Sequence, residues 1–141
     1  MTILGCITKY KADDIRPYVE SIEQTGFKGR KVMLVYEVPK ETIDYLKSKG
    51  WDLYGGELQQ HIILQRFRDL YKLLGSEIKG TVIWTDVKDV IFQKDPTEWI
   101  DHNMEDDILS FSECIKFKDD PWACVNACLL YTSPSPRDPH L

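Results

Sequence analysis

Two kinds of segment alternate along the chain. Short apolar runs rich in β-branched and aromatic residues are typical of buried strands, and they lie at 3–7, 31–36, 51–54, 81–84 and 108–111. Between them, apolar residues recur at three- and four-residue steps, which is typical of amphipathic helices. The alternation predicts an α/β fold with a mostly parallel sheet and helices on both of its faces.

Capping and chain-breaking residues predict where these helices begin and end. The first helix is expected to start at Asp13 or Asp14 and to end at Gly26. Gly55 and Gly56 predict a turn after the third strand. Three more helices are expected over 39–50, 58–74 and 96–100, and the second of these has the strongest pattern in the chain.

Composition favours a single globular domain. The chain has 141 residues, of which 43% are hydrophobic and 11% aromatic, so it can build a core. A net charge of −5 without a basic cluster argues against nucleic-acid binding. No apolar run approaches the length of a membrane span. The first ten residues are too quickly charged for a signal peptide, which predicts a cytoplasmic protein if Met1 is the natural start.

The four cysteines do not form a recognisable metal motif. Cys124 and Cys128 are four residues apart, but no second cysteine or histidine pair accompanies them. Cys6 and Cys114 stand alone. We therefore expect free thiols in a reducing compartment.

The stretch TVIWTDVKDVIFQKDP, residues 81–96, carries the candidate chemistry. Its apolar start predicts a fully buried strand, and Asp86 and Asp89 follow directly. Paired acids after a buried strand would lie at the carboxyl edge of the sheet, where open α/β folds bind ligands. Carboxylates there suit Mg²⁺ or Mn²⁺ carrying a phosphorylated substrate. The alternative is that both acids are solvated turn residues.

Two common phosphate-binding motifs are absent. Neither a G-x-G-x-x-G fingerprint nor a P-loop occurs in the chain. Any nucleotide chemistry would then depend on a metal ion and side chains. Asp95 and Pro96, at the end of the stretch, are expected to form a turn and start a helix.

The C-terminal residues differ in character from the rest. From Cys128 the chain reads CLLYTSPSPRD, and its back-translation matches a transposase-type sequencing adapter read in frame. Residues 128–141 are therefore predicted to be non-native and disordered, and the biological sequence to break off near Ala127, leaving residues 1–127 as an incomplete domain. Cys128, Arg137, Asp138 and His140 then carry no chemistry. The alternative is a native terminus rich in proline and serine.

The segment TDVKDVIFQKDP resembles the metal-binding segment of glycosyltransferases with the GT-A fold. In many of them a buried strand runs into D-x-D, or D-x-[RK]-D in one group, followed by V-h-F-Q-x-D-P, where h is hydrophobic. The preceding strand–helix order and the helix containing QRFRDLYKLL are also similar. The resemblance covers residues 1–127 and is specific between Trp84 and Pro96. It implies a Rossmann-like GT-A domain, a nucleotide-diphosphate sugar donor, Mn²⁺ or Mg²⁺, and an unknown glycan, protein or small-molecule acceptor.

The resemblance also implies roles for individual residues. Aligning Val87-Lys88-Asp89 with D-x-D replaces the first acid by valine, so Asp89 is expected to be the main metal ligand. Asp86 would then bind the metal, directly or through water, or contact the ribose or sugar. Lys88 would contact the substrate phosphate or pair with an acid.

Two further elements are implicated by the same resemblance. The loop after the first strand is expected to meet the base and ribose through Thr8, Lys9 and Tyr10. Arg66, on the long helix, is expected to reach the diphosphate or the donor sugar. The alternatives are an ordinary loop role for Tyr10 and, for Arg66, a surface ion pair with Asp69 or Glu57.

Two other classes of function stay open. One is another metal-dependent phosphate enzyme, such as a hydrolase that uses Asp86, although haloacid-dehalogenase-like enzymes need D-x-D after the first strand and none follows Ile7. The other is a non-catalytic nucleotide-sugar-binding homologue. The full-length protein is expected to be an enzyme, and the 141-residue chain to have little or no transferase activity, because the acceptor side would lie beyond residue 127.

Overall fold

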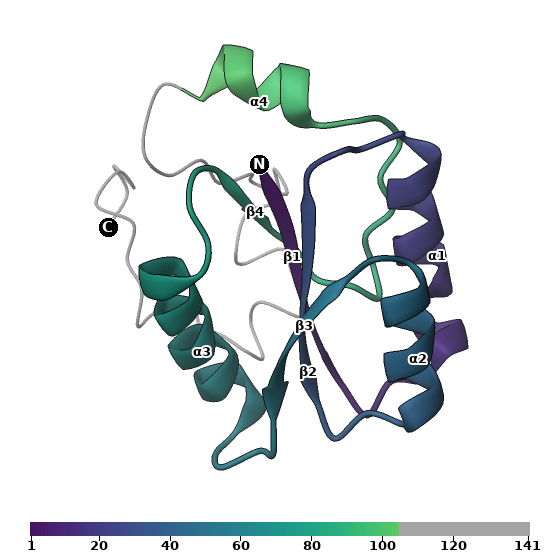
Figure 1. Cartoon of the computed structure of the whole chain (residues 1–141), viewed down its shortest axis with the longest axis vertical. Helices are drawn as coiled ribbons and strands as arrows, with labels where there is room; N and C mark the ends of the chain where they lie inside the picture. The colour runs from purple at the N-terminus through teal and green to yellow at the C-terminus, as the bar shows by residue number, and fades with distance from the viewer. Residues whose placement is uncertain (105–141) are drawn as a thin grey trace, which may run out of the picture. The chain divides into compact units, whose positions relative to one another are not determined.

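Strands and helices alternate along residues 1–104, which are the residues that the computed structural model describes. The sheet has the order β3-β2-β1-β4 and consists of the parallel strands β1 (Thr2–Thr8), β2 (Arg30–Tyr36), β3 (Asp52–Gly56) and β4 (Val82–Trp84). The helices are α1 (Ala12–Gln24), α2 (Lys40–Ser48), α3 (Ile62–Ser76) and α4 (Thr97–Asn103). Figure 1 shows α1 and α2 on one side of the sheet and α3 on the other. The predicted α/β fold, with a parallel sheet and helices on both faces, is confirmed.

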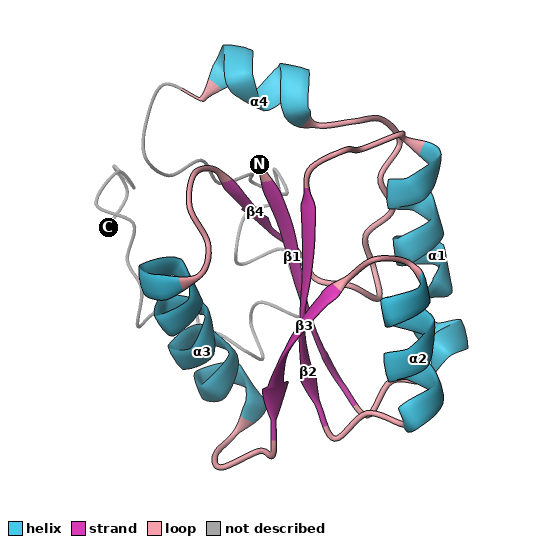
Figure 2. Cartoon of the chain, viewed as in Figure 1, coloured by secondary structure: helices cyan, strands magenta, loops and turns pink. Residues whose placement is uncertain are grey.

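The strand order changes direction at β1. The chain adds β2 and β3 on one side of β1 and then places β4 on the other side (Figure 2). β2 pairs with the whole of β1, whereas β4 pairs only from Thr2↔Val82 to Leu4↔Trp84. The gap between the ends of β1 and β4 is therefore a topological switch point, where open parallel sheets bind ligands.

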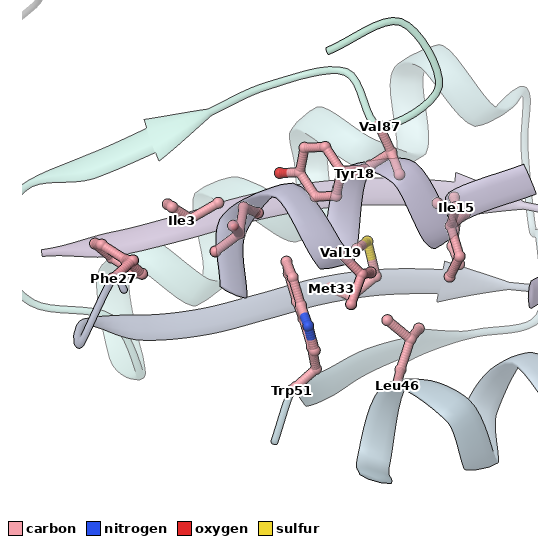
Figure 3. Packing of buried hydrophobic residues seen from close by; sticks show 11 residues of the cluster. Ile3, Ile15, Tyr18, Val19, Phe27, Met33, Leu46, Trp51 and Val87 are labelled. Atoms are coloured by element: carbon pink, nitrogen blue, oxygen red, sulfur yellow. The ribbon is translucent and has the colours of Figure 1, made fainter. Parts of the chain in front are cut away.

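One face of the sheet, called here the α1/α2 face, packs against two helices. Apolar residues at three- and four-residue steps on α1 meet alternate residues of β1 and β2. The buried cluster, shown in Figure 3, consists of Ile3, Ile7, Ile15, Tyr18, Val19, Ile22, Phe27, Met33, Leu46, Trp51 and Val87. Burial of this apolar surface is the main force that holds both helices on the sheet.

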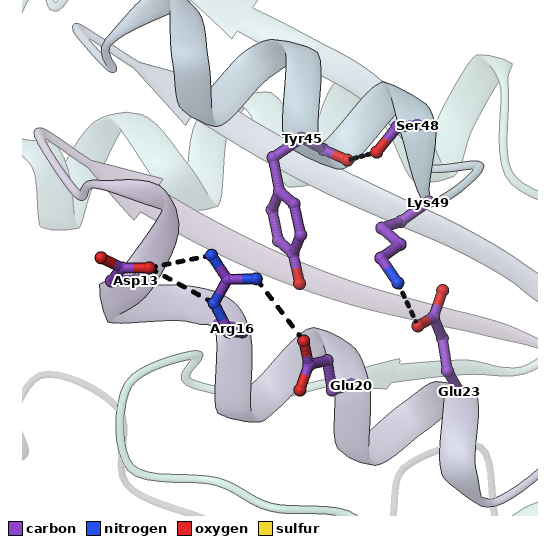
Figure 4. Close-up of polar contacts among 7 residues, drawn as sticks. All are labelled: Asp13, Arg16, Glu20, Glu23, Tyr45, Ser48 and Lys49. Carbon is purple, nitrogen blue, oxygen red and sulfur yellow. Dashed lines mark hydrogen bonds and ion pairs between the residues drawn. The ribbon is translucent and has the colours of Figure 1, made fainter.

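Polar contacts tie α1 to α2 at the rim of this face. Lys49 lies 2.8 Å from the Glu23 carboxylate, and the Arg16 guanidinium lies over the Tyr45 ring, 5.2 Å from its centroid. Arg16 also pairs with Asp13 at 2.9 Å, within α1 (Figure 4). Each partly exposed ion pair contributes little by itself, so these contacts orient the two helices more than they stabilise them.

Within residues 1–104, the opposite face of the sheet, called here the α3 face, packs against the single helix α3. Its buried cluster is smaller and consists of Leu4, Val32, Leu34, Tyr36, Leu73 and Ile78. α3 keeps four large apolar side chains exposed by 61%, 52%, 81% and 41%, namely Leu64, Phe67, Tyr71 and Leu74. Three of them belong to the apolar pattern that predicted this helix.

Helix boundaries differ from the predictions at several ends; α4, for example, runs to Asn103 and not to residue 100. α1 begins after Lys11, and neither Asp13 nor Asp14 is its N-cap. Asp14 instead reaches back from the first turn and accepts a hydrogen bond from the Lys11 N–H at 2.8 Å. α3 begins at Ile62 and not at residue 58, because the Gln65 side chain accepts the Gln59 N–H at 2.8 Å and holds the preceding residues in a turn.

The strands also differ from expectation. All three residues of β4 are half-buried, so the prediction of a fully buried strand is wrong; within residues 1–104, β4 pairs on one side only. Gly55 and Gly56, predicted as a turn, pair with β2 as the end of β3. A Cβ at Gly55, where φ is +120°, would collide with the backbone oxygen of Val35, so only glycine fits there.

The predicted start of α4 is confirmed. Thr97 donates its N–H to the Asp95 carboxylate at 2.9 Å, and Pro96 precedes the first helical residue. Residues 1–103 form one compact unit. The predicted strand at 108–111, the cysteines Cys114, Cys124 and Cys128, and the predicted boundary after residue 127 lie outside the described residues. None of the helices described combines the length and apolarity that crossing a bilayer requires.

Candidate functional site

The predicted site residues at the end of β1 and in the loops after β1 and β4 flank the switch point. β4 ends level with Leu4, so the chain leaves the sheet while β1 continues to Thr8. The Thr85 N–H donates to the Leu4 carbonyl at 3.1 Å, and the following residues pass over β1. Residues 85–92, called here the acidic loop, therefore lie beside the end of β1 and the loop that follows it.

Arg66 and Asp86 meet at this position. The Arg66 Nη1 lies 3.4 Å from the Asp86 Oδ1, and their side chains are 27% and 72% exposed. This pairing replaces the alternative of an ion pair with Asp69 or Glu57. The Arg66 Nε is buried without a hydrogen-bond partner, so the exposed part of the guanidinium lies at its terminal nitrogens.

Two stacked aromatic rings, one from α3 and one from β4, lie beside the Arg66 guanidinium. Arg66 lies 5.2 Å from the centroid of the Phe67 ring, and that ring stacks on Trp84 at 5.8 Å with an interplanar angle of 10°. A cation over an aromatic face is attracted by the ring quadrupole. The stack therefore links the charge on α3 to the strand that leads into the acidic loop.

Lys88 and Tyr10 bring the two loops together. The Lys88 ammonium lies over the Tyr10 ring, 5.8 Å from its centroid. Among residues 1–104, Lys88 has no ion-pair partner, so the alternative of pairing with an acid does not apply there. The Tyr10 carbonyl accepts the Thr42 hydroxyl at 3.0 Å, which fixes this loop against α2.

Lys9 has a partner that the sequence did not identify. Its ammonium lies 3.2 Å from the Glu37 carboxylate, at the end of the neighbouring strand β2. Both residues have left-handed backbones, with φ of 58° and 51°. Such conformations are uncommon for residues with a side chain and often occur at functional positions. An acid directly after the second strand was the available signal for Glu37.

Thr8 and Arg66 share an unusual property. Their Oγ1 and Nε atoms are two of the four buried side-chain polar atoms that lack a hydrogen-bond partner in the described part of the chain, and the others belong to Tyr45 and Trp51. Buried polar groups normally have partners. Two of the predicted site residues thus present unsatisfied polar atoms beside the switch point.

Charged groups also surround Cys6 on the α3 face. Burial raises the pKa of the Cys6 thiol to about 11; Arg66 opposes this shift, whereas Asp86 and Asp69 reinforce it. The Tyr36 hydroxyl donates a hydrogen bond to the Asp69 carboxylate at 2.7 Å. Burial and this carboxylate both raise the pKa of Tyr36. Cys6 is a free thiol and stays protonated at neutral pH.

A shallow pocket of about 260 Å³ lies at the carboxyl ends of β2 and β3. Its walls are mostly apolar, with one carboxylate, and consist of Val35, Glu37, Val38, Ile43, Leu53, Tyr54, Gly55 and Gly56. Glu37 joins this pocket to the loop after β1 through its pairing with Lys9.

The carboxylates of the acidic loop can supply only part of a metal site. Asp86 and Asp89 are both exposed. The described residues contain no group of three or more histidines, cysteines, aspartates or glutamates that could hold a metal ion. One or two carboxylates fit Mg²⁺ or Mn²⁺, which keep several waters and take further oxygens from a substrate phosphate.

The structure therefore brings together Arg66 with Asp86 and Tyr10 with Lys88. Asp89 stands exposed, and in residues 1–104 it has no ion-pair partner. Comparison with family models gave no match, and no curated protein or solved structure matched the chain significantly.

Proposed function

We propose that the chain is the donor-binding part of a metal-dependent glycosyltransferase of the GT-A type, which transfers a sugar from a nucleotide-diphosphate donor to an acceptor. The observation that carries the proposal is the pairing of Arg66 with Asp86 beside the switch point. A guanidinium with exposed terminal nitrogens suits a diphosphate, and an adjacent exposed carboxylate suits the cation that accompanies one.

The cations around the switch point bind the diphosphate in this proposal. Arg66 has a fixed charge and a planar set of donors that match phosphate oxygens. Lys88, on the acidic loop, adds positive charge, and Lys9, which follows β1, would exchange its pairing with Glu37 for the diphosphate. Thr8, whose hydroxyl has no partner, and Tyr10 would contact the nucleoside.

Asp89 and Asp86 would hold the divalent ion, with water and donor oxygens completing its shell. Such an ion supplies Lewis-acid stabilisation of the charge that grows on the leaving diphosphate. Asp86 is already oriented by Arg66, whereas Asp89 projects into solvent. Asp86 directly precedes the buried Val87, whereas Asp89 lies between the exposed Lys88 and the half-buried Val90.

A nucleotide-sugar-binding protein without transferase activity is the second candidate. Val87 occupies the position where the resemblance places the first acid, and it is only 3% exposed within the α1/α2 face. A buried valine cannot be a metal ligand. This substitution favours nucleotide binding with a weakened or missing metal requirement.

Thermal unfolding with nucleotides tests the proposal. UDP or GDP with Mn²⁺ is expected to stabilise the 141-residue chain, by about 2.7 kcal/mol at a ligand concentration of 100 Kd. Arg66→Gln is expected to abolish this stabilisation, whereas Arg68→Gln, an exposed arginine on the same helix, retains it. The absence of stabilisation by any nucleotide diphosphate would contradict both candidates.

The metal requirement separates the two candidates. In the transferase reading, Asp89→Ala removes the Mn²⁺-dependent part of the stabilisation, and Asp101→Ala, an exposed acid on α4, leaves it intact. Stabilisation by nucleotide that is equal with and without Mn²⁺ supports the non-catalytic protein. The chain alone is expected to turn over little or no sugar nucleotide; turnover that disappears in Asp89→Ala would overturn that expectation.

A further inference from the structure

Two buried hydroxyls on one side of α1 contact the acidic loop. The Tyr18 hydroxyl lies 2.8 Å from the Thr85 Oγ1, and the Ser21 Oγ accepts the Phe92 N–H at 3.0 Å. Tyr18 is 1% exposed and Ser21 5%. Their spacing of three residues places them on the same face of the helix. α1 therefore contacts the loop at its first residue, Thr85, and at its last, Phe92.

Ser21 has the hydrogen-bonding capacity that this contact requires. Its single hydroxyl proton is donated to the Tyr18 carbonyl within α1 at 2.8 Å. The lone pairs of the oxygen are then left to accept from Phe92. A serine whose hydroxyl bonded only within its own helix would make no hydrogen bond to the acidic loop.

A third anchor lies between the other two. Val87 is 3% exposed and packs over Gly5 of β1, where a Cβ would lie 2.6 Å from its Cγ2. Figure 3 shows Val87 directed into the same cluster as Tyr18 and Ile15. Phe92 adds an edge-to-face contact with the Tyr18 ring at 5.9 Å. The absence of a side chain at Gly5 is what lets the loop lie this close to the sheet.

The anchored residues alternate with the charged ones. Thr85, Val87 and Phe92 make the inward contacts, whereas Asp86, Lys88 and Asp89 are exposed. We propose that Tyr18 and Ser21 are positioning residues of the donor site, which hold Asp86 and Asp89 in place for a nucleotide diphosphate and its divalent cation. This inference rests on the function proposed above.

The physical reason is the cost of ordering. A loop that is already fixed loses little conformational freedom when its carboxylates bind an ion, so binding is tighter. Tyr18 also fills the core with its ring, and phenylalanine would do the same. The hydroxyl that reaches Thr85 is the part of Tyr18 that core packing does not explain.

Tyr18→Phe and Ser21→Ala remove these hydroxyls from the chain, and two control variants match them. Tyr45→Phe removes a buried hydroxyl that packs against the same cluster but has no hydrogen-bond partner. Ser48→Ala removes a hydroxyl that donates only to the Tyr45 carbonyl within α2, at 2.6 Å. The controls reproduce the chemical change without the contact to the acidic loop.

Hydrogen exchange measures the anchoring without reference to any ligand. Amides of residues 86–92 are expected to exchange about tenfold faster in Tyr18→Phe and Ser21→Ala, because the loop opens more often. Tyr45→Phe and Ser48→Ala are expected to match the wild-type chain. Equal exchange in the wild type and in both test variants would overturn the proposal.

Manganese titration measures what the anchoring does for binding. With UDP present, the test variants are expected to bind Mn²⁺ about 10- to 100-fold more weakly than the wild type, while UDP binding without metal is unchanged. Unaltered Mn²⁺ affinity would also overturn the positioning role. A wild-type chain that does not bind Mn²⁺ with any nucleotide diphosphate refutes the metal-dependent function itself, and hydrogen exchange then decides alone whether α1 holds the loop.

Discussion

The two faces of the sheet differ in what covers them and in what they carry. On the α1/α2 face, two helices and the acidic loop bury a continuous cluster from Ile3 to Val87. On the α3 face, helix α3 covers a smaller cluster and leaves apolar side chains such as Tyr71 exposed. The charged groups Arg66 and Asp69 lie on this second side.

The difference indicates a division of roles. The α1/α2 face is a rigid support, because close packing leaves its side chains few alternative positions. The α3 face supplies charge at the edge of that support. Asp86 links the two faces. Its neighbours Thr85 and Val87 are held on the α1/α2 face, and its carboxylate pairs with Arg66 on the α3 face.

The largest expected contrast is between one leucine on each face. Leu46 on α2 is fully buried, whereas Leu74 on α3 is 41% exposed. Leu46→Ala is expected to lower the free energy of unfolding by about 2–5 kcal/mol through lost burial and a cavity. Leu74→Ala is expected to change it by about 0.5 kcal/mol or less. Urea unfolding measures both, and an equal loss for Leu74→Ala would show that Leu74 is covered in solution.

A pair of glycines gives the next contrast. A Cβ at Gly5 would lie 2.6 Å from Val87 and 3.1 Å from the Met33 sulfur, whereas a Cβ at Gly75 in α3 meets nothing within 4 Å. Gly5→Ala is expected to destabilise the chain by about 1–3 kcal/mol through overpacking. Gly75→Ala is expected to stabilise it by about 0.4–1 kcal/mol, because alanine reduces the freedom of the unfolded chain.

A double-mutant cycle then tests where the Gly5 clash acts. If Val87 is the obstacle, Gly5→Ala and Val87→Ala together cost less than the sum of their separate effects. Additive losses would mean that Val87 does not pack over Gly5, and would remove one anchor of the acidic loop.

The two faces are also expected to differ in their response to alkaline pH. Burial raises the pKa of Cys6 from 9.0 to about 11 on the α3 face, and burial raises the pKa of Tyr18 from 10.0 to about 12 on the other, with its hydrogen bond to Thr85 opposing the shift. Folding favours the neutral forms, so both contributions are complete below the ordinary pKa and are lost as pH rises through the folded-state value.

Variants separate the two titrations. Cys6→Ala is expected to lose less stability than the wild type between pH 9 and 11, and Tyr18→Phe less between pH 10 and 12. Chemical denaturation at a series of pH values measures both windows. If the free energy of unfolding falls equally with pH in the wild type and in Cys6→Ala, the Cys6 thiol is accessible to solvent.

Local patterns were sufficient to predict the four strands and four helices of residues 1–104. Runs such as Lys31–Tyr36 carry their own signal, because apolar β-branched residues suit a buried strand in any context. Burial was harder to predict, since it depends on what packs against a segment. Val82–Trp84 reads as a fully buried strand, yet it is half-buried because its pairing within residues 1–104 is one-sided.

The site was predictable where chemistry follows a strand end and not where it depends on distant contacts. Asp86 could be placed at the sheet edge from its position alone. Its pairing with Arg66 and the roles of Tyr18 and Ser21 could not, because these contacts join segments that only the fold brings together. The signal for Glu37 was weak because a single acid after a strand is common.

The pairing of β4 has a consequence for how the molecule assembles. Thr2 pairs with Arg30 on one side and with Val82, far later in the chain, on the other. Closing the longer loop costs more chain entropy, and during synthesis the N-terminal residues emerge first. We therefore expect β1, β2 and β3 to form with α1 and α2 while Tyr18 and Ser21 still lack their partners. Among residues 1–92, the acidic loop would dock last, because it follows β4, and three residue pairs hold that strand to the sheet.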